Sequence, residues 1–220
     1  MVRWSRVRRI SRSPLAVAGG LVIVLTFLLA RHLPEQREAE MGRFTVTEIV
    51  DGDTFHTSGG DKVRLANVDT PEKDEPYYEE AADLLESLVL FRPVKLEYPP
   101  RRRDQYGRLL AYISIDSTFI GEELLRAGLG YVLLFNEKER DHPRVKRLIA
   151  AQQKAIDDRV GLWSLERVPE SHYLVKKARF RLHRPFCRSV EDLDSSQVVS
   201  YATREEGLQQ GYAPCRRCRP

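Results

Sequence analysis

The residues of this sequence best suited to chemistry are acids and arginines gathered in three short segments. They stand in "DGDTF" (Asp51, Asp53), "VRLANVDTPE" (Arg64, Asp69, Glu72) and "DQYGRLLAYI" (Arg108). Cleaving a phosphodiester requires an activated water, cations that bear the charge growing on the phosphate oxygens, and help for the leaving oxygen. Carboxylate oxygens suit a hard ion such as calcium or magnesium. The three segments together therefore supply the groups that such a reaction needs.

The spacing in "VRLANVDTPE" indicates how its charged side chains meet. In an extended strand Arg64 and Val68 share a face, whereas Asp69 and Glu72 lie at and beyond the strand end, where the Thr-Pro step bends the chain. The acids can then line a rim, with the guanidinium projecting across it. Taken alone, the same run also fits a solvated strand end with a surface ion pair.

Alternating and helical patterns predict the elements that position these segments. Strands are expected at 43–50, 53–57, 62–68, 94–98 and 108–115, a further strand at 129–135, and helices at 75–91, 120–128 and 142–158. Five or so strands interrupted and followed by helices suggest an α+β fold, a small β-barrel with helices packed on it. An OB-type barrel is the natural candidate.

The three segments, in this order, resemble the signature segments of the staphylococcal nuclease (thermonuclease) family. The resemblance covers residues 43 to about 163, including "GLW" near its end. It implies a five-stranded OB-fold nuclease domain with three helices, secreted or membrane-tethered. It also implies a phosphodiesterase, an endonuclease that hydrolyses DNA and RNA with calcium and leaves 3'-phosphates.

The resemblance assigns roles to the acids. Asp53 and Asp69 would be the calcium carboxylates, and the backbone carbonyl of Thr70 would be a third oxygen ligand. Glu72 would act as general base on the attacking water, or organise it through hydrogen bonds. Asp51 is expected to shape the turn or to support the ligands, because Asp-Gly forms turns wherever it occurs.

Arg64 and Arg108 would bind the phosphate and stabilise its added charge, a task that suits a bidentate guanidinium that is always charged. Tyr106, in the turn before Arg108, is expected at least to pack. The sequence departs from the family where its best-known member has two tyrosines beside the nucleotide base, because Leu134 and Asn136 stand there. Base stacking of that kind is not expected.

A second set of chemical groups lies at the C-terminal end. His183 and Cys187 form an H-x3-C pair, and Cys215 and Cys218 form a C-x2-C pair. Four such ligands match a tetrahedral structural zinc site, since about fifty residues cannot build much core unaided. The segment is similar to the zinc-binding domain of Ada-type DNA repair proteins, with His183 where that family has a Cys. A Cys215–Cys218 disulfide is the alternative.

The N-terminus predicts export. Residues 1–31 hold six Arg and no acid, which leaves 30 basic against 32 acidic side chains in the rest of the chain. The uncharged run at 14–30 reaches about 25 Å as a helix, which fits a signal peptide or a tilted transmembrane anchor. The Arg cluster before it should stay in the cytoplasm. The catalytic domain is therefore expected on the extracytoplasmic side of the cell membrane, or secreted if the segment is cleaved.

We expect three regions: a basic segment, anchor or signal, and linker at 1–40; the nuclease domain at 41–168; and a zinc module at 169–220. The module carries ten Lys/Arg against six acids in 170–220, which could hold nucleic-acid phosphates. The rival function is a membrane-anchored OB-fold protein that binds nucleic acid without cutting it. A zinc-centred repair sensor with a passive barrel is a third possibility.

Overall fold

A closed barrel of five strands carries the predicted site. Its strands are β1 (Arg43–Asp51), β2 (Thr54–Thr57), β3 (Lys62–Leu65), β5 (Pro93–Glu97) and β6 (Leu109–Ile115). They pair in the order β3-β2-β1-β5-β6, and a parallel pairing of β3 with β6 closes the sheet on itself. The expected OB-type barrel is confirmed.

The structure, a computed structural model, describes residues 43–177 and 179–220. The expected signal or anchor segment at 14–30 lies outside the described residues. Among the residues that are described, we find no helix with both the length and the apolar character that a bilayer crossing demands.

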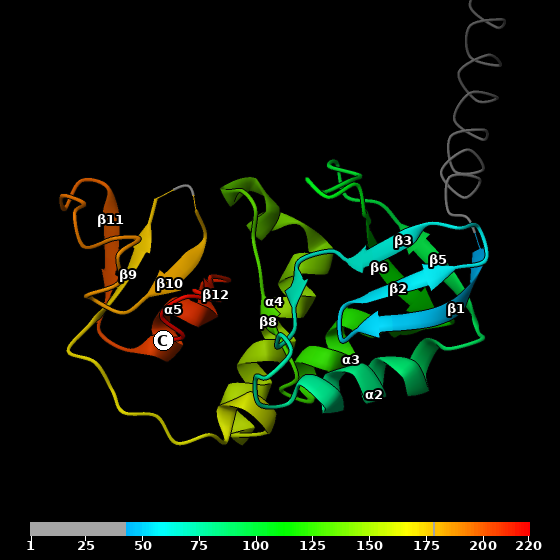
Figure 1. The fold of residues 1–220 in the computed structure, drawn as a ribbon, viewed down its shortest axis with the longest axis horizontal. Coiled ribbons are helices and arrows are strands. Elements are labelled where there is room, and N and C mark those ends of the chain that lie inside the picture. Colours follow the sequence, from blue (N-terminus) through cyan, green and yellow to red (C-terminus); the bar gives the residue numbers. More distant parts are fainter. Residues whose placement is uncertain (1–42, 178) are drawn as a thin grey trace, which may run out of the picture. The chain divides into compact units, whose positions relative to one another are not determined.

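Apolar faces of helices cover the barrel, as the periodicity predicted. The helices are α2 (Tyr78–Val89), α3 (Ile120–Arg126) and α4 (Pro143–Asp158). Helix α2 packs on β1, and α3 packs on β6 and α4 (Figure 1). Helix α2 begins later than expected because Tyr77 has a φ of 67°, which no right-handed helix accepts. Helix α4 begins where expected, with Pro143 in its first turn and the His142 ring accepting the Arg144 N–H.

Short elements complete the barrel domain. Strand β4 (Val68–Asp69) pairs with β8 (Tyr131–Val132), and β7 (Thr118–Phe119) pairs with β6; the short helices are η1 (Glu137–Asp141) and η2 (Gly161–Trp163). The strand expected at 129–135 is therefore only two residues long. Beyond it the backbone is held elsewhere, because the Leu134 N–H donates to the Gly211 carbonyl of the C-terminal segment.

The C-terminal residues form a second sheet. Its strands are β9 (Tyr173–Lys176), β10 (Arg181–His183), β11 (Val198–Tyr201) and β12 (Ala213–Pro214), in the order β11-β9-β10-β12. Helix α5 (Arg204–Gln209) begins with a capping box, in which the Thr203 hydroxyl and the Glu206 carboxylate each accept the other's backbone N–H. We call residues 173–220, which contain this sheet, α5 and their connecting loops, the C-terminal module.

Buried contacts attach the C-terminal module to the barrel domain. The Gln152 side chain of α4, 1% exposed, accepts the Val132 N–H at 2.8 Å and donates to the Leu208 carbonyl at 2.7 Å. Apolar side chains of the module, such as Leu182 and Leu208, share one core with the barrel helices. Residues 43–220 consequently form one compact unit. The predicted boundary near residue 168 stays a prediction.

Gly128 and Gly161 hold the chain where α3 ends against the end of α4. Gly128 has a φ of +71°, and a Cβ there would lie 2.2 Å from the Val160 carbonyl oxygen. Gly60, in the turn between β2 and β3, has a φ of +81° but open space around it. Both positions need the left-handed region, but only Gly128 also needs the absence of a side chain.

We therefore expect Gly128→Ala to lower the free energy of unfolding by about 3–5 kcal/mol, from left-handed strain together with the backbone clash. Gly60→Ala should lower it by only about 1–2 kcal/mol, from the strain alone. Urea unfolding followed by circular dichroism measures both values. Equal losses in the two variants would show that the Gly128–Val160 contact is not as close as described.

Candidate active site and metal centre

The two predicted calcium carboxylates, Asp53 and Asp69, are buried, and the Arg64 guanidinium bridges them. Arg64 on β3 is 4% exposed, and its Nη2 donates to Asp53 Oδ2 and Asp69 Oδ1, both at 2.9 Å. Its Nη1 donates to the Leu65 carbonyl at 3.3 Å. The spacing predicted a guanidinium that crosses a rim formed by Asp69 and Glu72. The guanidinium does contact Asp69, but the second carboxylate that it contacts is Asp53. The guanidinium lies beneath them and not out in solvent, so the alternative of a solvated strand end with a surface ion pair is wrong.

The turn at "DGD" places Asp53. Asp51 Oδ1 accepts the Asp53 N–H at 3.0 Å, so Asp51 shapes this turn as predicted. A Cβ at Gly52 would lie 2.7 Å from Ala81 Cβ and 2.9 Å from Thr70 Oγ1, so only glycine lets α2 and Thr70 come this close. The Thr70 N–H in turn donates to Asp53 Oδ2 at 3.4 Å. The turn therefore brings Asp53 and Thr70 together.

The pKa values of the two acids shift in opposite directions, because more positive charge surrounds Asp69 than Asp53. Desolvation raises the pKa of Asp53 to about 6, because Arg64 offsets only part of it and the nearby Asp51 and Asp69 charges add to it. Burial acts on Asp69 as well, but the positive charges of Arg181, Arg64 and Arg216 together lower its pKa below the usual value. Asp53 is thus the acid of the site that is short of compensating positive charge.

Glu72 lies at the rim, as predicted. Its side chain is half exposed, and Oε1 forms an ion pair with Arg216 Nη1 at 2.5 Å. The Glu72 backbone N–H donates to the Glu75 side chain at 2.8 Å, which holds this loop in place. A carboxylate in such a position can meet both water and an incoming substrate.

Arg108 faces the same cavity from the far side. Its Nε donates to Asp104 Oδ2 at 2.7 Å, and its Nη1 donates to Thr54 Oγ1 at 3.4 Å, next to Asp53. Tyr106, 75% exposed, lies under the Arg108 guanidinium with its ring centroid 5.5 Å away. Tyr106 therefore packs on this side chain and not in the core.

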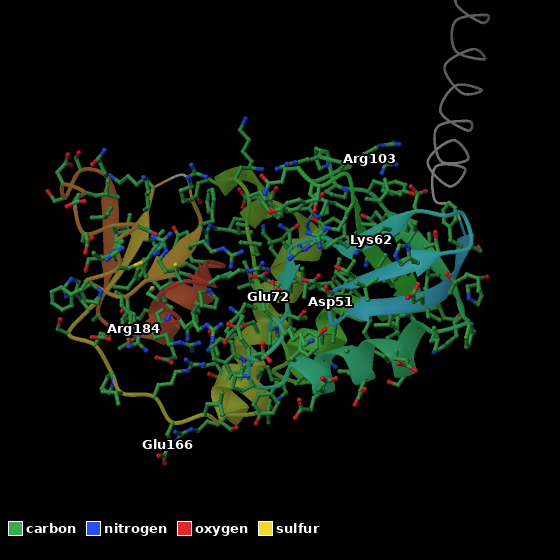
Figure 2. The ribbon with its side chains drawn as sticks, viewed as in Figure 1. Asp51, Lys62, Glu72, Arg103, Glu166 and Arg184 are labelled. Atoms are coloured by element: carbon green, nitrogen blue, oxygen red, sulfur yellow. The ribbon has the colours of Figure 1, made fainter. Side chains whose placement is uncertain are left out.

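The predicted residues line one cavity of about 360 Å³. Asp51, Lys62 and Glu72, labelled in Figure 2, contribute to its wall. The remaining lining residues are Asp53, Arg64, Thr70, Pro71, Tyr106, Arg108 and Arg216. Asp69 is 3% exposed and does not line this cavity itself, but it contacts two residues that do, Arg64 and Arg216. The structure thus brings the predicted catalytic and calcium residues together.

The donors fit a hard divalent cation. Asp53 and Asp69 both contact Arg64 and could offer carboxylate oxygens to one ion, and calcium accepts carboxylates and backbone carbonyls in flexible geometry. The raised pKa of Asp53 supports this fit, since a cation nearby would relieve the cost of burying its charge.

Two arginines of this site were missed from the sequence. Arg181 on β10 donates to Asp69 Oδ2 at 2.6 Å, and Arg216 donates to Asp69 Oδ1 at 2.9 Å. They lie more than one hundred residues from Asp69 in the chain. The one available signal was the position of Arg216 inside the C-x2-C pair of a basic segment.

The positions that depart from the family present no aromatic ring. Leu134 is buried, and the Asn136 side chain donates to Glu139 at 2.8 Å. Phe135 between them is 37% exposed, with the Arg101 guanidinium 5.9 Å from its ring centroid. The aromatic surface in this segment is thus offered by a different residue from those in the family pattern.

The four predicted zinc ligands converge in the C-terminal module. Strands β10 and β12 run parallel with Leu182 opposite Pro214, which sets His183 beside Cys215. One ligand atom from each of His183, Cys187, Cys215 and Cys218 lies within 4.8 Å of the others. A zinc ion at about 2.0–2.3 Å from each ligand fits such a cluster.

The three cysteines are free thiols in the structure. Hydrogen bonds from Cys218 and His183 lower the pKa of Cys215 well below its usual value, which favours the thiolate that zinc binds. The Arg184 N–H donates to Cys218 Sγ at 3.3 Å, as the backbone commonly does toward a metal-bound sulfur.

Comparison with known proteins supports the nuclease domain. The model of the family described as "Staphylococcal nuclease homologue" matches residues 62–165, which include Arg64, Asp69, Glu72 and Arg108. Endonuclease YncB of Bacillus subtilis (strain 168) is 34% identical over 142 residues, 59% of this chain and 65% of that protein. This chain thus spans slightly less than two thirds of YncB.

Two further relatives are matched over more of their length. Thermonuclease of Staphylococcus hyicus is 26% identical over 168 residues, 67% of this chain and 98% of that protein. A protein of Escherichia coli O157:H7 named "Uncharacterized endonuclease" is 32% identical over 123 residues, 54% of this chain and 75% of that protein.

The pKa of Asp53 predicts a pH effect on stability. Because folding raises this pKa, the folded protein binds the proton more tightly, and stability falls as the pH rises from about 4 to about 6. In calcium-free buffer, Asp53→Asn should remove up to about 3 kcal/mol of this fall. Urea unfolding at a series of pH values measures it, with the exposed Asp83→Asn as control. An unchanged pH profile would contradict the raised pKa.

The metal centre predicts bound zinc. Purified protein should contain about one zinc per chain by elemental analysis, and Cys218→Ser should lose it and melt at a lower temperature. Replacing the partly exposed His172 with Ala should change neither value. Alkylation of the unfolded, non-reduced protein separates the alternatives: three modified cysteines support zinc, and one supports a Cys215–Cys218 disulfide.

Proposed function

Because the chain belongs to the staphylococcal nuclease family, we propose that it hydrolyses phosphodiester bonds of DNA, RNA or both, with calcium held by Asp53 and Asp69. The observation that carries this proposal is the Arg64 guanidinium bridging the two acids, beside Glu72 and Arg108 in one cavity. The names of the relatives, endonuclease and thermonuclease, support the same reaction class.

Asp53, Asp69 and the backbone carbonyl of Thr70 would hold the calcium ion, as the family resemblance implies. When bound, the ion would supply charge stabilisation to the phosphate oxygens. Arg64 fixes the two carboxylates in place, because both of its Nη atoms donate to Asp53, Asp69 or the Leu65 carbonyl. Direct phosphate binding by Arg64 requires the exchange of one of these bonds.

Glu72 is the proposed general base. Its exposed carboxylate accepts a proton from the attacking water, whose oxygen bonds to phosphorus as the bond to the 5'-oxygen breaks. The leaving 5'-oxygen takes a proton from solvent, so the cleavage leaves a 3'-phosphate and a 5'-hydroxyl. Arg108, held by Asp104 and open to the cavity, bears part of the charge that grows on the phosphate oxygens.

The rival function, binding without cutting, requires that part of the catalytic set be lost. All five residues are present, and the cavity brings Asp53, Arg64, Glu72 and Arg108 together with Asp69 directly behind them. This completeness favours hydrolysis over passive binding.

We also propose that the nuclease domain acts outside the cytoplasm. Support comes from the sequence, in which an Arg-rich N-terminus precedes the uncharged run at 14–30. A retained segment would leave the domain tethered to the membrane, and a cleaved one would release it.

Glu72→Gln should lower kcat by about 100- to 10,000-fold, because the variant keeps the shape of the side chain but cannot take a proton. Initial rates on a labelled oligonucleotide with calcium measure this loss. Glu80→Gln, an exposed change on α2, should leave the rate unchanged. Wild-type protein in a calcium chelator should be inactive, and full activity in the chelator or in Glu72→Gln would end the proposed mechanism.

A further inference from the structure

Two arginine side chains of the C-terminal module contact an acid of the barrel domain. Asp69 accepts from three guanidinium groups, and two of these, Arg181 and Arg216, belong to the module. Arg64 is the one contributed by the barrel itself. The polar site is therefore built from both sheets.

Arg216 is the most open of the three guanidinium groups. Its side chain is 52% exposed, against 5% for Arg64 and 23% for Arg181. Its Nη2 donates to Asp69 Oδ1 at 2.9 Å, and its Nη1 forms an ion pair with Glu72 Oε1 at 2.5 Å. Of the cations on Asp69, Arg216 is thus the one that an incoming phosphate meets first.

The metal ligands fix the position of Arg216. It lies between Cys215 and Cys218, two of the four residues in the predicted zinc cluster. Arg181 strengthens the same connection, because its Nη1 donates both to Asp69 Oδ2 and to the Pro214 carbonyl directly before Cys215. The metal centre and the acids are therefore joined through a few residues of backbone.

We propose that Arg216 is a substrate-binding residue that contacts a phosphate at the scissile bond, and that the His183–Cys187–Cys215–Cys218 centre holds it there. This inference rests on the proposed nuclease function, and adds to it the part of the site that lies outside the barrel. Arg181 is a positioning residue, since it acts on Asp69 and on the backbone that carries Arg216.

The ion pair between Arg216 and Glu72 is better suited to exchange for a substrate phosphate than to stabilising a closed site. The Arg216 and Glu72 side chains are 52% and 50% exposed, and exposed ion pairs contribute little to stability. A phosphate accepts two parallel hydrogen bonds from one guanidinium, so it can displace Glu72. The displaced carboxylate is then free to take a proton from water.

The surface beyond Arg216 continues as a basic groove. A cavity of about 420 Å³ reaches from Arg108 and Arg216 to Arg101 and Phe135, and a neighbouring cavity of about 660 Å³ shares Arg101, Phe135 and Arg181 with it. Three further cations line these cavities, Lys176, Arg179 and Arg217, and they form no ion pair with any described residue. Unpaired cations beside exposed rings fit the backbone and bases of an extended single strand.

The test compares three variants of the full-length protein: Arg216→Gln, Arg216→Lys and Arg126→Gln. Arg126 on α3 is a matched control, because it is 49% exposed and also pairs with two acids, Glu122 and Glu123. Binding of a labelled single-stranded oligonucleotide is measured by fluorescence anisotropy in calcium-free buffer at several salt concentrations. Cleavage with calcium is measured separately, and zinc content and melting temperature are recorded for each variant.

We expect Arg216→Gln to weaken binding by about tenfold or more, since it removes a charge-assisted contact. The slope of log affinity against log salt should become shallower by about one unit, because one phosphate contact is lost. A purely structural role of Arg216 would leave this slope unchanged. kcat/KM should fall by about 100-fold, and Arg216→Lys should lie between Arg216→Gln and the wild type. Arg126→Gln should match the wild type.

Unchanged binding in Arg216→Gln would overturn the proposal. Tighter binding or faster cleavage would also overturn it, and would show that Arg216 inhibits the site by occupying Asp69 and Glu72. If Arg216→Gln loses zinc or melts at a lower temperature, the proposal is tested with Arg216→Lys, by the same measurements of binding, salt dependence and cleavage. Failure of the proposed function looks different: the wild type would then bind the strand through Arg216 but not cut it with calcium.

Discussion

The site depends on one buried guanidinium between two buried carboxylates. Arg64 donates to Asp53 and Asp69 in a region where none of the three side chains is more than 7% exposed. Removing one partner from such a pair leaves an uncompensated charge and costs about 3–5 kcal/mol. Folding of β2, β3 and β4 must therefore bring all three together, so the geometry of the acids is set by the barrel before any ligand arrives.

The charge balance around this pair explains why the site needs more cations. Asp51, Asp53, Asp69 and Glu72 outnumber the three cations that the barrel itself brings to this site, Lys62, Arg64 and Arg108. The surplus negative charge favours either a divalent ion or further arginines. The C-terminal module supplies two arginines to Asp69, but none of its described side chains pairs with Asp53. Asp53 accordingly keeps a raised pKa while that of Asp69 is lowered. The two acids occupy one site but differ in their need for a metal.

Local patterns in the sequence were enough to predict the barrel, the long helices and the approach of Arg64 to Asp69 at the end of a strand, because alternation determines which residues share a face. The family resemblance, and not the spacing, added Asp53 to this site. The two-residue length of β8 could not be predicted, since the Gly211 carbonyl of the distant module takes the Leu134 N–H. The same limit hid Arg181 and Arg216. Their contacts with Asp69 depend on how two sheets pack, and no periodicity within either segment encodes that packing.

The parallel pairing of β10 with β12 has a consequence for the order in which the protein is made. Strand β12 and the Cys215–Cys218 pair lie at residues 213–218, whereas the acids that Arg216 contacts lie at 69 and 72. A ribosome reaches the acids early and Arg216 only about 140 residues later, which takes on the order of ten seconds at typical rates of synthesis. Throughout that interval the nascent chain carries the barrel acids without the arginine that the module adds to them.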